Sequence, residues 1–274
     1  MKNATTRAIS VSRTARIGAI LALGIALSAC ASGRDQMSTG SIPGGDSRKP
    51  VAAMNTVEID AATRRVGTAY ERNPQDKSIG MSYASILNMN GRSDQALAVM
   101  QQVAISHPSD NEVLAAFGKA QAAAGELQPA LDTIRRAQTP DRPDWKLLSA
   151  EGAILDQLDR PQEARALYRK ALDIQPNEPS VLSNLGMSYL LKGDLPAAET
   201  YLKTAVAQPE ADSRVRQNLA LVVGLQGRFG EAEQIAAGEL EPAQAAANVA
   251  YLRNILAQQN AWADLADRDA SATN

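Results

Sequence analysis

Small and apolar residues recur along most of the chain at a constant spacing of 34 residues. One series is alanine throughout, a second is alanine or glycine, and a third is glycine except at one position. The three series are Ala62, Ala96, Ala130, Ala164, Ala198 and Ala232; Ala84, Gly118, Gly152, Gly186 and Ala220; and Gly91, Gly125, Asp159, Gly193 and Gly227. A fixed period of this length indicates a repeat protein in which each unit buries its apolar face against its neighbours.

Residues 179–212 show how one unit is built. Gly186 and Ala198 are small, so the first helix of the unit can approach the second closely where they cross. Gly193 is placed to end the first helix, and Pro209 prevents the second helix from continuing. The pattern therefore predicts a hairpin of two antiparallel helices.

This unit resembles the tetratricopeptide repeat (TPR), which has the same length. The matching residues are Leu182, Leu185, Gly186, Tyr189, Ala198, Leu202 and Ala205. The unit 145–178 departs from the TPR pattern at Glu151, where Leu is expected, and at Asp159, where Gly is expected, so its turn follows the pattern least closely. The resemblance implies an all-α fold, a TPR solenoid of antiparallel helix hairpins in a right-handed superhelix. An ordinary alanine-rich helical bundle is the alternative.

The period divides the solenoid, residues 57–260, into repeats and caps. Before the first full repeat the chain matches only the second helix of a repeat. After the last repeat, Val249, Leu252, Ile255 and Leu256 form a stripe that would cover the final apolar face. We expect a half repeat at 57–76, full repeats at 77–110, 111–144, 145–178, 179–212 and 213–246, a capping helix at 243–258, and a polar tail at 261–274 that frays.

The N-terminal residues have the pattern of a secretory signal peptide. Basic residues without acids occur before residue 17, and an apolar run follows at 17–27. This run is roughly half as long as a transmembrane helix, which favours a signal peptide over a membrane span. Residues 30–56 are rich in Gly, Ser and Pro without an apolar period, and they predict a disordered, flexible tether.

Residues 27–30, Leu-Ser-Ala-Cys, resemble the lipobox of bacterial lipoproteins. The resemblance implies that the signal peptide 1–29 is cleaved between Ala29 and Cys30, that the Cys30 thiol carries diacylglycerol, and that the new amino terminus is acylated. Ala31 stands where an Asp would often signal retention in the inner membrane, so we expect an outer-membrane anchor with the chain facing the periplasm. A buried or incidental Cys beside an ordinary cleavage site is the alternative.

The composition leaves little room for catalytic chemistry. A single Cys excludes an intramolecular disulfide framework and a zinc site of several thiolates, and a single His excludes the HExxH pattern and multi-histidine cages. The net charge of -2 gives no sign of nucleic-acid binding. His107 stands beside Pro108 near a helix end, where we expect it to face a carbonyl. We predict no enzyme activity, no cofactor, no metal site and no small-molecule substrate.

TPR arrays usually bind protein segments along the face formed by the first helices of the repeats. In the register above, positions 2, 5, 9, 12 and 13 of each first helix line this face, and the asparagines at position 6 could bond a partner's backbone. Met and Leu there suit an amphipathic or extended partner segment. For Met187 and Leu221, packing against the next repeat is the alternative. The predicted protein-binding residues are Met81, Met89, Lys146, Asn184, Leu190, Leu191, Arg214, Gln217, Asn218 and Leu225.

The C-terminal half resembles a narrower group of proteins. Residues 214–233 and 247–253, the sequence Pro-Asp-Trp at 143–145, and the lipobox with its tether are similar to TadD-type TPR lipoproteins of tight-adherence (Flp) pilus assembly. The resemblance implies a lipid anchor in the membrane and protein partners among pilus assembly or secretin components. The alternative is an adaptor that recruits cell-wall enzymes to the outer membrane.

Replacing Cys30 with Ser tests the lipoprotein hypothesis. Because the hydroxyl does not replace the thiol as the lipid attachment site, Cys30→Ser should accumulate as an unacylated precursor that still carries residues 1–29. Metabolic labelling with palmitate and the mass of the purified chain measure both effects. A variant that is processed and partitions with membranes like the wild type would contradict the hypothesis.

Overall fold

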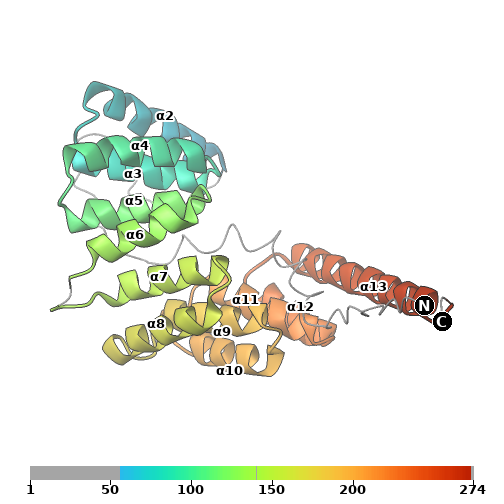
Figure 1. Ribbon diagram of the computed structural model, residues 1–274. Helices are drawn as coiled ribbons and strands as arrows, with labels where there is room; N and C mark the ends of the chain where they lie inside the picture. The colour runs from blue at the N-terminus through green and yellow to red at the C-terminus, as the bar shows by residue number, and fades with distance from the viewer. Residues whose placement is uncertain (1–55, 140, 273–274) are drawn as a thin grey trace, which may run out of the picture. The chain divides into compact units, whose positions relative to one another are not determined.

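The computed structural model describes residues 56–139 and 141–272, which form twelve α-helices and no strand (Figure 1). The all-α prediction is therefore confirmed for this part of the chain. None of these helices is both long and apolar enough to cross a membrane. The predicted signal peptide, Cys30 and all but the last residue of the predicted tether lie outside the described residues.

The folded chain divides into two compact units that meet in sequence after Pro176. The helices of the N-terminal unit are α2 (Thr56–Arg72), α3 (Lys77–Met89), α4 (Ser93–Ser106), α5 (Asn111–Ala123), α6 (Leu127–Ala137), α7 (Trp145–Gln157) and α8 (Pro161–Ile174). Those of the C-terminal unit are α9 (Pro179–Leu191), α10 (Leu195–Val206), α11 (Ser213–Leu225), α12 (Phe229–Ala237) and α13 (Pro242–Ala272).

Consecutive helices pair as hairpins in each unit. In the N-terminal unit α3 packs on α4, α5 on α6 and α7 on α8, and in the C-terminal unit α9 packs on α10 and α11 on α12. The first helices of these hairpins start at Lys77, Asn111, Trp145, Pro179 and Ser213, which are the first residues of the five predicted repeats. The predicted solenoid of helix hairpins is thus confirmed as the fold class.

The start of each first helix is set by an acidic side chain. The residue immediately before the helix accepts a hydrogen bond from a backbone N–H in the first turn, which satisfies a donor that has no partner within the helix. These capping residues recur every 34 residues, in step with the repeats. The sequence prediction did not use this signal. The capping residues are Asp76, Asp110, Asp144, Glu178 and Asp212.

The turn inside each hairpin needs a residue in the left-handed region of backbone space. Gly91, Gly125, Gly193 and Gly227 have φ between 69° and 85°. Asp159 takes the same conformation in the unit 145–178, with φ of 56°. The departure from Gly therefore leaves the turn intact, because Asp is one of the few residues that tolerate this region.

Close contact between the two helices of a hairpin depends on the small residue in the first helix. A Cβ added to Gly118 would lie 2.8 Å from the Ile134 side chain. Equivalent atoms on Gly152 and Gly186 would lie 2.7 Å from the Tyr168 ring and 2.9 Å from the Leu202 side chain. Each large residue is fully buried, so it has no space into which to withdraw.

The ends of the array are covered by helices. α2 packs on α3 through Ala62, Val66 and Ile86, as a cap must. At the other end, α13 packs on α11 and α12, and it continues past residue 258, where the capping helix was predicted to end. Residues 261–272, predicted as a fraying polar tail, are helical. The reason is the alanine-rich sequence of residues 243–272, which contains no Gly or Pro to stop a helix.

Two Gly→Ala substitutions separate conformation from packing. Neither Gly125 nor Gly230 has an atom within 4 Å of an added Cβ, but Gly125 has φ of +85° and Gly230 lies in α12. We expect Gly125→Ala to lower the free energy of unfolding by about 1 kcal/mol, because L residues are strained in that region. Gly230→Ala should raise it by about 0.5 kcal/mol through helix propensity.

Urea denaturation followed by circular dichroism measures both changes. Equal effects of the two substitutions, in either direction, would contradict the assignment of the turn.

Candidate functional site

The first helices of the N-terminal unit present only part of the predicted binding face. Met81 is 8% exposed and belongs to the core between α3, α4 and α5, so its assignment to the face is wrong. Met89, at the end of α3, is 43% exposed and remains accessible. Lys146 is half-buried, and its Nζ lies 5.6 Å from the centre of the Trp145 ring. The prediction is wrong for Met81 and stays a prediction for Met89 because the two differ in burial, and the 34-residue period alone does not indicate burial.

In the C-terminal unit the aliphatic residues of the predicted face differ in exposure. Leu190 is fully buried, and its assignment is wrong, because a side chain inside the core cannot contact a partner. Leu191 and Leu225 are half-buried and keep part of their surface accessible. Met187 and Leu221 are also half-buried, so each combines packing within the unit with an accessible edge.

Three polar residues of this face have partners within the C-terminal unit. The Asn218 side chain donates to Ser183 Oγ over 3.0 Å, which joins α11 to α9. Gln217 is exposed and donates to Ser213 Oγ over 3.0 Å, and Arg214 lies 3.3 Å from the Asp212 carboxylate. Asn184, the equivalent of Asn218 in the preceding repeat, is half-buried. Asn218 was predicted to bond the backbone of a partner, but its side chain instead joins two repeats of this chain.

A carboxylate links the last two full repeats. Glu199 in α10 lies 2.6 Å from Nη2 of Arg228 and 2.7 Å from Nζ of Lys203, and it accepts a hydrogen bond from Gln226 over 2.8 Å. These donors, Arg228 above all, lower the pKa of Glu199 from its usual value to about 2. The cluster fixes the turn between α11 and α12 against α10.

In the unit 145–178, two buried polar groups have partners. Glu151, where the TPR pattern expects Leu, is 8% exposed and lies 2.7 Å from Nε of Arg135 in α6. Tyr168 donates from its Oη to Asp156 over 3.0 Å, and burial raises the pKa of the phenol. Both residues are therefore structural, and neither faces an open site.

His107 behaves as the sequence predicts. It is the C-cap residue of α4, and its Nε2 lies 2.9 Å from the carbonyl oxygen of Gln75. Among the residues that the structure describes, no three acidic, Cys or His side chains come together in a way that could hold a metal ion.

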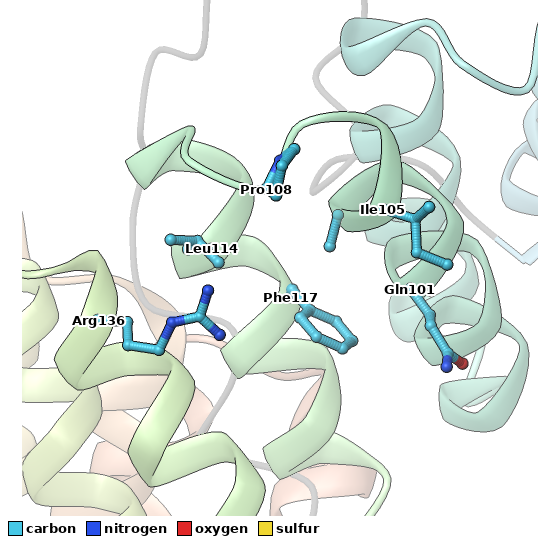
Figure 2. A pocket seen from close by; sticks show the side chains of 7 residues that line it. Gln101, Ile105, Pro108, Leu114, Phe117 and Arg136 are labelled. Atoms are coloured by element: carbon cyan, nitrogen blue, oxygen red, sulfur yellow. The ribbon is translucent and has the colours of Figure 1, made fainter.

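The N-terminal unit also has an open groove of about 360 Å³ that the sequence prediction missed (Figure 2). We label the first and second helices of each repeat A and B. The groove is flanked by two B helices, α4 and α6, and we call it the B-face groove. The prediction used only the first helices. The signal in the sequence is Ile105, a large apolar residue where other repeats have the smaller or polar Thr139, Asp173 and Ala207. The groove is lined by Gln101, Ala104, Ile105, Pro108, Leu114, Phe117 and Arg136.

Comparison with known proteins agrees with this fold. The family described as tetratricopeptide repeat matches residues 90–145 and, again, residues 157–222. No protein of curated function matches the sequence.

Solved structures with similar folds come from different settings. A chain of the APC/C hetero-tetramer Cut9–Hcn1 has 18% identity and a TM-score of 0.54, over 70% of this chain and 40% of that one. The protein described here thus spans less than half of that relative. PilW, described as a widely conserved type IV pilus biogenesis factor, has 19% identity and a TM-score of 0.54, over 73% and 91% of the two chains. A thermophilic TPR protein of Thermus thermophilus has 25% identity and a TM-score of 0.54, over 69% and 98%.

The Glu199 cluster makes a prediction about pH. A carboxylate whose pKa is lowered by folding stabilises the folded state above its unfolded pKa and loses this effect as pH falls through the folded value. Glu199→Gln should lower the free energy of unfolding at pH 7 by about 1–3 kcal/mol. The difference from wild type should shrink as pH falls from about 4.5 towards about 2.

Urea denaturation at several pH values measures this difference. Glu233, one repeat later, is exposed and provides the control, since Glu233→Gln should change stability by less than about 0.5 kcal/mol. A Glu199→Gln deficit that does not depend on pH in this range would contradict the role of the ionised carboxylate.

Proposed function

We propose that this tetratricopeptide-repeat protein is a lipid-anchored periplasmic scaffold that binds partner proteins during assembly or secretion of Flp pili and assists the outer-membrane secretin. The anchor is Cys30, and residues 30–56 hold the repeats away from the bilayer. The observation that carries the pilus assignment is the resemblance of residues 214–233 and 247–253 to TadD-type lipoproteins.

These two segments belong to one packed body in the C-terminal unit. A Cβ on Gly224 of α11 would lie 2.6 Å from the Leu252 side chain of α13, and Ala220, Ala236 and Ala245 form a buried cluster nearby. The Arg253 guanidinium lies 4.7 Å from the centre of the Phe229 ring. Several residues of the two resembling segments therefore pack α13 onto the last repeat, namely Ala220, Gly224, Phe229, Leu252 and Arg253.

Tyr251 differs in exposure from the aliphatic residues beside it in α13. It is 69% exposed, whereas Val249 is buried and Leu252 is half-buried. Surface tyrosines are often binding hot spots in protein interfaces, because burial of a large, rigid side chain on binding costs little conformational entropy. In the C-terminal unit we assign Tyr251 and the exposed Gln217 to partner binding, together with the partly accessible Leu191 and Leu225.

The fold supports a scaffold rather than a catalyst. In the C-terminal unit the partly accessible Leu191 and Leu225 are apolar, which suits an amphipathic or extended segment of a partner. Met89 is a separate exposed apolar side chain in the N-terminal unit. PilW has the same fold and is described as a pilus biogenesis factor. At its level of identity this likeness concerns the fold, so the pilus assignment rests on the sequence resemblance.

A pull-down with the full-length chain in detergent tests the proposal. The wild type should retain the Flp secretin or other Flp assembly components, identified by mass spectrometry. Tyr251→Ala combined with Gln217→Arg should reduce their recovery by about tenfold, since the loss of one interface tyrosine is worth about 1–2 kcal/mol. Ile174→Ala removes a comparable exposed apolar side chain from α8 and should have no effect.

Recovery of cell-wall enzymes in place of pilus components would favour an adaptor and contradict the proposal. Equal recovery by wild type and the double variant would contradict the assigned residues.

A further inference from the structure

The B-face groove lies on a surface separate from the predicted face of the first helices. None of the predicted protein-binding residues lines it. Figure 2 shows Gln101 and Ile105 on α4, Leu114 and Phe117 on α5 between the two second helices, and Arg136 on α6. All lie in the N-terminal unit.

The lining of the groove is mainly apolar and partly open to water. Ile105 is 68% exposed, although a β-branched side chain of this size is usually buried. Phe117 is half-buried and packs against the core of α3, α4 and α5 on one side, so its position is fixed. A partner that covered these side chains would remove apolar surface from water without rearrangement of the repeat.

Arg136 places a positive charge at the edge of this apolar surface. In Figure 2 its side chain extends from α6 towards α5. Among the described residues, no group forms an ion pair or hydrogen bond with its guanidinium. The preceding residue, Arg135, is in contrast paired with Glu151. Arg136 is therefore available to a carboxylate, which guanidinium groups bind with two parallel hydrogen bonds.

From this combination we infer that the B-face groove binds a segment of a partner protein that carries an Asp or Glu beside bulky apolar side chains. The apolar side chains would lie over Ile105 and Phe117, with the buried Leu114 beneath them, and the carboxylate would pair with Arg136. The Gln101 amide, which is also without a partner among the described residues, would bond the backbone of the segment. This site does not depend on the pilus assignment.

The shape of the groove favours a peptide over a fatty acyl chain. A volume of about 360 Å³ accommodates a few side chains, and the groove is partly open to solvent. Small apolar ligands are usually enclosed over most of their surface, which an open groove does not provide. A peptide needs only one face covered, since its other face can remain in water.

A peptide selection on the purified full-length chain tests the inference. A random peptide library displayed on phage is selected on the wild type and counter-selected on Arg136→Glu. The selected sequences should carry Asp or Glu next to apolar residues. A synthetic peptide from the selection, with blocked termini, should bind Arg136→Gln and Ile105→Asp at least about tenfold more weakly than wild type in fluorescence anisotropy.

Two controls identify the contact itself. Arg92→Gln removes an exposed arginine from the far end of α4 and should leave peptide affinity unchanged. Exchange of the peptide's acidic residue for Lys should weaken binding to the wild type and restore binding to Arg136→Glu. This restoration would not occur if Arg136 acted only through the stability of the repeat.

Four results would overturn the inference. They are selected peptides without acidic residues, equal binding to all variants, saturable binding of a fluorescent fatty acid that is lost in Arg136→Gln, and a wild-type dimer in sedimentation velocity that Ile105→Asp converts to a monomer. The last would show that a second copy of the chain occupies the groove.

Discussion

The structure depends on one close contact, between a residue with almost no side chain in the first helix of a repeat and a large side chain in the second. In three successive repeats glycine lies under Ile134, Tyr168 or Leu202, at a distance that leaves no room for a Cβ. The two helices are held together by the burial of these large side chains. Because each repeat needs a small residue at this contact, small residues recur every 34 positions in the sequence. The capping carboxylates and the left-handed turn residues set where each helix starts and how the chain reverses, so that the contact can form.

This arrangement separates stability from binding. Each repeat uses its internal positions for packing, and its outer positions carry the exposed side chains. In the C-terminal unit, Tyr251 and Gln217 are on the surface while their neighbours pack α13 and α11. In the N-terminal unit, Ile105, Phe117 and Arg136 line the B-face groove. The ion pair between Glu199 and Arg228 joins the last two full repeats.

The sequence predicts the repeats well because packing constraints recur with the period. The starts of all five first helices follow from it, and Asp159 takes the conformation of the glycine that it replaces. Exposure does not recur in the same way, because it depends on what the neighbouring repeat places against a position. Leu190 and Met81 are therefore buried although their positions were predicted to face a partner. The extent of α13 and the B-face groove depend on local composition and on residues from three helices, which the period does not describe.

The most direct test of the contact is a double-mutant cycle at Gly152 and Tyr168. Helix propensity alone predicts that Gly152→Ala raises the free energy of unfolding by about 1 kcal/mol. The contact predicts the opposite, a loss of about 1–3 kcal/mol, since the new Cβ would overlap the buried Tyr168 ring. In a Tyr168→Ala background, where neither the ring nor another large side chain lies over residue 152, the same substitution should become stabilising. A gain in stability from Gly152→Ala in both backgrounds would contradict the account.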